Sequence, residues 1–342
     1  MHLWPLLSVA SQVMAHLNDS TARPFEIVSG PFSVVMLLIC GTGFISNLLI
    51  FLTTFRKDTS LKFKCNKLIG VLAVFDLLTC LLYCKVAFQL LFNWKWISQQ
   101  SCFWSEALNL FCLNTGSFLI WSVALDRFLA LQFPLWYDLW SVKGYVLSMV
   151  SPAVLYSGLL VVSGYLHRSS QIIVPICMPP SALRGVSLLH WLLGSSLLNV
   201  LVIFTNILAY RASKKLDSAA FATTSDETLV LVKRTSQSIA IVGMVYACTW
   251  MPVTVALAVV EQLQVSASTK FHIDMHLGLL SAVNISCNAF VYGLRSSKYK
   301  LEFTRFFGQN QTVPAGPNAG GKNTALLQQK LPSPNFVVAN HM

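Results

Sequence analysis

The sequence predicts an all-α membrane protein, a seven-transmembrane helix bundle followed by a short amphipathic eighth helix. Of its 342 residues, 55% are hydrophobic and only 11% are charged, and the mean hydropathy is +0.62. So few charges cannot cover a water-facing surface, and the same composition excludes a disordered chain. The net charge of +11 is therefore expected in loops beside anionic membrane lipid, with no nucleic-acid partner.

Seven stretches are long enough and poor enough in charge to cross a bilayer. A spanning helix needs about 20 apolar residues, and a charge at mid-bilayer is costly. Six stretches contain no charged residue, and the second in chain order, Leu68 to Cys84, contains only Asp76. The predicted spans within a core of residues 31–294 are 31–55, 67–91, 102–127, 144–166, 186–210, 235–260 and 274–294.

The distribution of Lys and Arg predicts the orientation of the chain. Most of the 24 lie in the loops after the first, third and fifth spans and in the tail. The positive-inside rule then places the amino terminus outside and the carboxyl terminus in the cytoplasm of a multi-pass plasma-membrane protein. The loops are expected to be short except around Cys177 outside and from Ala212 to Arg234 inside.

The segments that flank the predicted core have their own signals. Residues 1–30 form an extracellular segment in which Asn18 begins a glycosylation sequon. Residues 296–307 place aromatic residues at helical spacing between basic ones, which predicts an amphipathic helix on the inner leaflet. Residues 308–342 are rich in Gly, Pro, Asn and Gln and are expected to be a disordered cytoplasmic tail.

Polar residues at membrane depth must find partners inside the bundle. Asp76 is the foremost, and Asn47, Asn284 and Asn288 should lie at a similar depth. One interpretation is a sodium or proton site between helices, and the other is structural pairing of amides. Four such residues on three helices, one of them ionisable, favour the functional interpretation.

The sixth span contains a candidate pivot. Pro252 removes a backbone hydrogen bond in mid-span and bends the helix, while Trp250 and Tyr246 precede it. An ordinary kink is the alternative, and it would be preferred if Pro252 stood alone.

These motifs occur in an order that resembles the rhodopsin-like, class A G-protein-coupled receptors across the whole spanning core. The matching stretches are Gly43-Phe-Ile-Ser-Asn47, Leu72-Ala-Val-Phe-Asp76, Asp126-Arg127-Phe128 with Pro134-Leu135, Trp250-Met-Pro252 and Asn288-Ala-Phe-Val-Tyr292. Divergent features, including Cys65-Asn-Lys-Leu-Ile, are similar to the serpentine chemoreceptors of nematodes. The resemblance implies a receptor for an extracellular ligand, a small molecule or short peptide, that activates a heterotrimeric G protein by outward movement of the sixth helix.

The resemblance also implies roles for individual residues. Cys102 and Cys177 would form an outside disulfide. Arg127, held at rest by Asp126, would be the central coupling residue. The residues implied to form the coupling surface are Asp126, Arg127, Pro134, Leu135, Lys233, Arg234 and Tyr292.

The ligand pocket is expected in the outer halves of the spans. Its candidate residues are Lys85, Glu106, Asn109, Leu113, His190, Trp250, His276 and Leu279. Lys85 and Glu106 could instead pair with each other. A retinal ligand is disfavoured because the seventh span has no Lys, and a biogenic amine because the third-span position that would carry a carboxylate is Asn109.

Other functions receive less support from the sequence. No catalytic constellation, metal-ligand spacing or phosphate-binding loop is present, so neither an enzyme nor a cofactor is expected, apart from possible Na⁺ at Asp76. A proton- or cation-coupled transporter that uses Asp76 is the main alternative, although the spans show no internal symmetry. A receptor-like chain with weak coupling is another, because Ala289 replaces the family's usual Pro and the fifth span lacks Pro.

Overall fold

The computed structural model describes residues 4–57, 59, 61–92, 97–174, 176–221, 226–263, 267–295 and 297–308. Within these ranges, side chains are described except at 4–29, 216–221, 226–240, 242–243, 267–268, 288–289, 292–295 and 297–298. The long helices are α1 (Trp4–Phe55), α2 (Lys64–Leu91), α3 (Gln99–Gln132), α5 (Val142–Leu166), α7 (Val186–Phe221), α8 (Asp226–Gln262) and α9 (Ala267–Arg295). The short elements are β1 (Ile97–Ser98), α4 (Pro134–Leu139), β2 (Ile173–Val174), α6 (Pro179–Ala182) and α10 (Ser297–Phe306).

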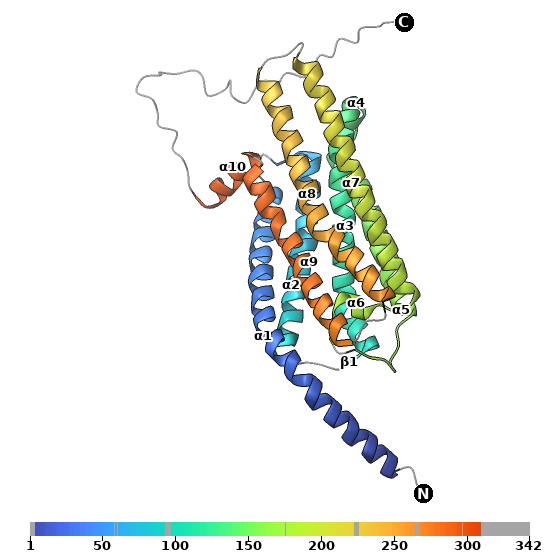
Figure 1. Ribbon diagram of the computed structural model, residues 1–342. Helices are drawn as coiled ribbons and strands as arrows, with labels where there is room; N and C mark the ends of the chain where they lie inside the picture. The colour runs from blue at the N-terminus through green and yellow to red at the C-terminus, as the bar shows by residue number, and fades with distance from the viewer. Residues whose placement is uncertain are drawn as a thin grey trace.

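The long helices form one bundle with α3 at its centre (Figure 1). Helix α3 packs against α2, α5 and α7, and α9 closes the bundle by packing against both α1 and α8. The two-stranded pair β1–β2 and α6 lie at one end of the bundle, and α4 and α10 lie toward the other. One end of the bundle therefore carries β1, β2 and α6, and α7 and α8 extend beyond the bundle at the other end.

Six helices within the described residues are long and apolar enough to cross a membrane. The candidate spans are Gly30–Phe55, Lys64–Leu91, Gln99–Gln132, Val142–Leu166, Val186–Lys215 and Met244–Gln262. They cover the first five predicted spans and residues 244–260 of the sixth, which was predicted as 235–260. Helix α9 covers the seventh predicted span and packs in the bundle, but it is less apolar because Lys270, Asp274 and several His and Ser residues interrupt it.

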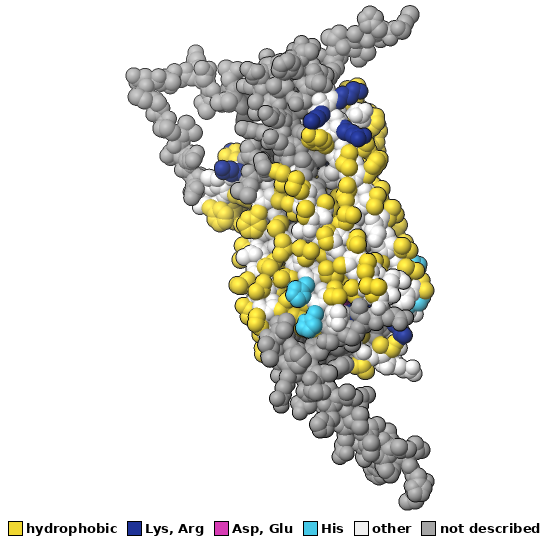
Figure 2. All heavy atoms as spheres, in the orientation of Figure 1, with side chains coloured by type: hydrophobic (Ala, Val, Ile, Leu, Met, Phe, Trp, Pro, Cys, Tyr) yellow, Lys and Arg dark blue, Asp and Glu magenta, His cyan; other side chains and the backbone are white. Residues whose placement is uncertain are grey.

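The outer surface of the bundle is apolar. Leu147, Leu155 and Leu159 of α5 are each at least 60% exposed, and so are Leu193 and Leu197 of α7. Figure 2 shows hydrophobic side chains spread over the middle of the visible face, with Lys and Arg near its ends. Exposure of this much apolar area to water would be unfavourable by about 25 cal/mol per Å², so the surface is suited to lipid.

The helices are longer than the predicted spans. Helix α1 begins at Trp4, and its first turns project beyond the bundle in Figure 1. Helix α7 continues to Phe221 and α8 begins at Asp226. The prediction of a long inside loop from Ala212 to Arg234 is therefore wrong, because most of these residues are helical. The physical reason is that charged residues mark the edge of the lipid, whereas helical backbone hydrogen bonds can continue in water.

Local sequence signals explain where several elements begin. The hydroxyl of Ser98 accepts a hydrogen bond from the backbone N–H of Ser101 and caps α3, and Ser141 caps α5 in the same way through Gly144. Pro134 and Pro179 stand in the first turns of α4 and α6, where a missing N–H costs nothing. These caps fix where the connecting loops leave the bundle.

Two glycines of α5 differ in their surroundings. A methyl group at Gly164 would lie 2.6 Å from a ring carbon of Phe103 and 2.8 Å from Leu183 Cδ2, whereas one at Gly158 would meet nothing within 4 Å. Gly164 therefore permits close packing of α5 against α3 and the segment after α6.

This contrast yields a stability prediction. We expect Gly164→Ala to lower the melting temperature of the purified protein, because overpacking costs about 1–3 kcal/mol and outweighs the roughly 1 kcal/mol gain in helix propensity. Gly158→Ala is the matched control and should keep or raise the melting temperature. Thermal unfolding in detergent checks both, and equal behaviour of the two variants would refute the packing argument.

Candidate functional site

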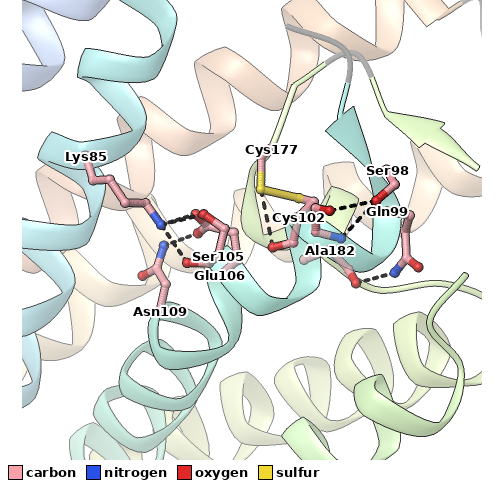
Figure 3. Close-up of a disulfide and its surroundings, with 10 residues drawn as sticks. Lys85, Ser98, Gln99, Cys102, Ser105, Glu106, Asn109, Cys177 and Ala182 are labelled. Atoms are coloured by element: carbon pink, nitrogen blue, oxygen red, sulfur yellow. Dashed lines mark hydrogen bonds and ion pairs between the residues drawn. A yellow bond between two sulfur atoms is a disulfide. The ribbon is translucent and has the colours of Figure 1, made fainter. Parts of the chain in front are cut away.

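A disulfide holds the loop end of the bundle together. It joins Cys102, in the first turn of α3, to Cys177 in the segment after β2 (Figure 3). Gln99 strengthens the same attachment, because its amide nitrogen donates to the Ala182 carbonyl at 2.6 Å and its amide oxygen accepts from the Ser169 N–H at 2.6 Å. The segment from β2 to α6 is thereby fixed across the bundle end.

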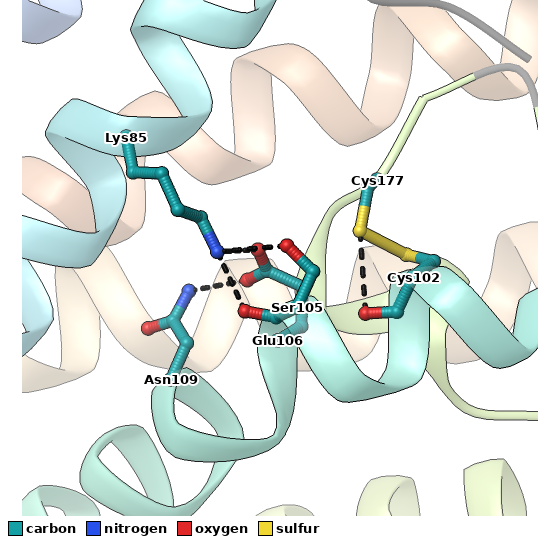
Figure 4. A network of polar contacts seen from close by, with 6 residues as sticks. All are labelled: Lys85, Cys102, Ser105, Glu106, Asn109 and Cys177. Atoms are coloured by element: carbon teal, nitrogen blue, oxygen red, sulfur yellow. Dashed lines mark hydrogen bonds and ion pairs between the residues drawn. A yellow bond between two sulfur atoms is a disulfide. The ribbon is translucent and has the colours of Figure 1, made fainter. Parts of the chain in front are cut away.

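Lys85 and Glu106 form a buried ion pair between α2 and α3. Lys85 Nζ lies 2.8 Å from Glu106 Oε1, and it also donates to the Ser105 carbonyl at 2.6 Å (Figure 4). The amide nitrogen of Asn109 donates to Glu106 Oε2 at 2.7 Å. Of the two roles that the sequence left open for Lys85 and Glu106, the structure shows the pairing. The Glu106 side chain is fully buried, so its charge depends on these partners.

A partly open cavity of about 30 Å³ lies beneath the segment that the disulfide fixes. Its wall comes from α2, α3, α7, α8 and α9 and from the loop around α6. The lining residues are Tyr83, Leu113, Met178, Pro179, Pro180, Trp191, Trp250, Val253, Leu257, Asp274, Leu277, Gly278 and Ser281. Leu113 and Trp250 are therefore the two predicted pocket residues that the structure brings to this cavity.

The other predicted pocket residues lie elsewhere. His190 is exposed and shares a hydrogen bond of 3.3 Å with Ser163, and His276 is exposed and lies with its ring edge against Phe32. Leu279 is half-buried and packs against the main hydrophobic core. These residues were expected in the pocket from their depth along the spans, but their side chains contact other parts of the protein. Depth along a span does not determine which face of the helix a residue occupies.

Sequence reasoning missed several lining residues, of which Asp274 is the most important chemically. Asp274 is 7% exposed, and its Oδ1 atom has no hydrogen-bond donor among the described residues. The same cavity is lined by Trp191 and Trp250, each 3% exposed. The predicted seventh span begins at Asp274, which makes this residue look like a boundary charge, but its position inside the long helix α9 is the signal that could identify it.

Asn47, Asp76 and Asn284, the members of the predicted polar network whose side chains the structure describes, are buried, and the hydrogen bonds of the two Asn residues join particular helix pairs. The Asn47 amide nitrogen donates to the carbonyl of Gly43 at 3.0 Å and to that of Ile285 at 3.3 Å, which joins α1 to α9. Asn284 accepts from the Thr249 hydroxyl at 2.9 Å, which joins α9 to α8. Asp76 is 4% exposed and lies beside Gly116 of α3.

The predicted pivot is tied to α7 by a residue that sequence reasoning missed. The Tyr246 hydroxyl donates to Asn199 Oδ1 at 2.6 Å, and the Asn199 amide nitrogen donates to the Thr254 hydroxyl at 2.6 Å. Pro252 lies inside α8 between these two attachments. Asn199 therefore clamps α8 to α7 on both sides of the proline.

At the opposite end, Asp126 is bound by Tyr137 of α4. The Tyr137 hydroxyl donates to Asp126 Oδ1 at 2.9 Å, and Lys64 Nζ lies 4.2 Å from the centroid of the Tyr137 ring. Burial, followed by the nearby Asp126 carboxylate, raises the pKa of the Tyr137 hydroxyl, which therefore stays a hydrogen-bond donor. Arg127 is half-buried, and Leu135 is 76% exposed.

Some predicted site residues lie outside the side chains that the structure describes. These are Asn18, Lys233, Arg234, Asn288 and Tyr292.

Comparison with known families identifies the kind of protein. The model of the family "Serpentine type 7TM GPCR chemoreceptor Srsx" matches residues 40–307. The chain belongs to this Srsx family. The match runs from within α1 to the end of α10, and it confirms the resemblance to class A receptors and to nematode-type chemoreceptors. A search of curated proteins gave no match.

Membership of the Srsx family makes the chain a multi-pass membrane receptor of the G-protein-coupled type. The family is one of receptors rather than enzymes. Membership of this family also does not favour the transporter that the sequence left as an alternative.

The ion pair yields a prediction that separates a structural from a ligand-binding role. Lys85→Met leaves the Glu106 charge buried without its cation. Breaking a buried pair lowers the free energy of unfolding by about 3–5 kcal/mol, and we expect a loss near the lower value because Lys85 is partly exposed. The double variant Lys85→Met, Glu106→Leu removes both charges and should recover most of the loss. Thermal unfolding of the purified variants measures this, and a double variant no more stable than Lys85→Met would contradict the pairing argument.

Proposed function

We propose that the chain is a receptor that binds a small extracellular molecule in the cavity lined by Trp250 and activates a heterotrimeric G protein. The observation that carries this proposal is the position of Trp250, which lines the cavity and stands two residues before Pro252 of α8. A ligand that contacts Trp250 acts directly on the bent region of the helix. It can therefore favour one arrangement of α8 over another.

The proposal includes a membrane topology. Helix α9 is the seventh span, the amino terminus with Asn18 is extracellular, and the tail is cytoplasmic at the plasma membrane. Support comes from the packing of α9 against both α1 and α8, and from the excess of Lys and Arg on the predicted inner side.

Helix α10 lies on the inner leaflet in this proposal. Its Tyr299 is buried, and the Tyr299 and Thr54 hydroxyls share a hydrogen bond of 3.2 Å that attaches α10 to α1. Leu301, Phe306 and Phe307 of the same segment are exposed and suited to contact lipid.

The coupling surface is proposed at the end of the bundle that contains Asp126 and α4. Outward movement of the inner part of α8 would uncover Arg127, and Leu135 would provide an apolar contact for the G protein. The exposed position of Leu135, just after Pro134 at the start of α4, supports this role. Lys233, Arg234 and Tyr292 complete the proposed surface from the sequence.

The closed state is proposed to depend on Asn199. If the bonds from Asn199 to Tyr246 and Thr254 exist only in the closed bundle, each contributes about 1 kcal/mol to closure. Their removal would shift the equilibrium toward the open state without any ligand.

Because loss of these bonds should activate the receptor without a ligand, the proposed G-protein coupling can be tested before the ligand is identified. Asn199→Ala should raise ligand-independent nucleotide exchange several-fold in cells that co-express candidate G proteins, because it removes both bonds. Adding Arg127→Ala should return exchange to the level of cells without receptor, at equal surface expression.

Asn206→Ala is the matched control for this experiment. Asn206 stands on the same helix, but its amide bonds the Val202 carbonyl within α7. It should leave basal exchange unchanged. Exchange that persists in the Asn199→Ala, Arg127→Ala double variant would remove Arg127 from the coupling mechanism.

A further inference from the structure

The cavity contains a buried carboxylate with an unused acceptor. Asp274 lines the cavity at 7% exposure, and no donor among the described residues reaches its Oδ1 atom. Burial of a charged group without a partner is strongly unfavourable. A carboxylate kept in such a place is best explained by a partner that arrives with the ligand.

The nearest cation on the same helix is already engaged. Lys270 stands one turn before Asp274, and it forms an ion pair with Glu261 of α8. The other buried acid near this end, Glu106, has both of its oxygens engaged by Lys85 and Asn109. Asp274 therefore differs from Glu106 in that the part of the chain that the structure describes leaves one of its acceptors without a donor.

The rest of the cavity wall suits the body of an organic cation. Trp191, Trp250 and Tyr83 supply aromatic rings, and Met178, Leu113 and other apolar residues complete the wall. Aromatic faces attract ammonium groups through the negative charge of the ring face, in addition to the attraction of the carboxylate. The combination of one acid with aromatic and apolar walls is suited to an ammonium group on a short apolar chain.

The volume limits the size of the ligand. The cavity measures about 30 Å³, and a water molecule needs roughly 10–15 Å³ by the same kind of measure. Two or three small groups fit inside, and a longer substituent would extend through the open side.

We propose that Asp274 is the counter-charge for the ammonium group of a small primary amine bound in this cavity. The inference rests on the proposed function, because it assigns a chemical class to the ligand of that receptor. It differs from the expectation that Asn109 disfavours amines, since the carboxylate comes from α9 rather than α3.

The test uses purified full-length receptor in phosphatidylcholine nanodiscs, with no G protein present. Butylamine and benzylamine should raise its melting temperature in a concentration-dependent way, because a ligand that binds only the folded state stabilises it. Butanol and benzyl alcohol, the neutral analogues of similar shape, should need at least tenfold higher concentrations. This comparison uses the unmodified chain, so it remains valid even if variants fold poorly.

Asp274→Asn removes the charge with little change in shape and should weaken the response to both amines at least tenfold. Asp138→Asn is the matched control, because it makes the same substitution at an exposed position on α4, and it should respond as the unmodified receptor does.

Three results would overturn the proposal: equal responses to amines and alcohols, an unchanged amine response in Asp274→Asn, or no amine response up to roughly 10 mM, a concentration that corresponds to a binding free energy of about 2.7 kcal/mol. Amine binding without stimulated nucleotide exchange would support the site while counting against the proposed coupling function.

Discussion

The constraint on which this structure depends is the lack of water inside an apolar bundle. An inward polar side chain finds its partners within the bundle, often on a neighbouring helix, since lipid offers none. Asn47 meets this need at the backbone of Ile285, Asn284 at Thr249, and Asn199 at Tyr246 and Thr254. The same bonds join α1 to α9, α9 to α8 and α8 to α7. Helices without strong sequence amphipathicity thereby obtain defined neighbours.

The sequence predicts the depth of residues well and their direction poorly. Six spans agree with helices of the structure because charges, which lipid excludes, mark where each span ends. His190 and His276 were predicted in the pocket from depth alone, yet both are exposed because almost every face of these helices is apolar and no face signals the interior. Asp274 was overlooked for a related reason, because a charge near the end of a span looks like its boundary.

Long-range partners were beyond sequence reasoning for a different physical reason. Asp126 is bonded to Tyr137, which lies in a six-residue helix too short to show any periodicity. Likewise, the cavity receives Met178 only because the disulfide and Gln99 fix the loop across the bundle end. The resemblance implied which cysteines pair, but the course of the loop between them depends on contacts with α3 that no local pattern encodes.

The distinction between satisfied and unsatisfied polar groups connects structure to signalling. Glu106 is buried with its partners in place, so its ion pair with Lys85 joins α2 to α3 without any ligand. Asp274 is buried with an acceptor unused, so part of its interaction energy becomes available only on binding. Because Trp250 lines the same cavity and stands two residues before Pro252, a ligand held by Asp274 on α9, as proposed, would also reach α8 near its proline. In that proposal, binding at α9 acts on the part of α8 that Asn199 attaches to α7.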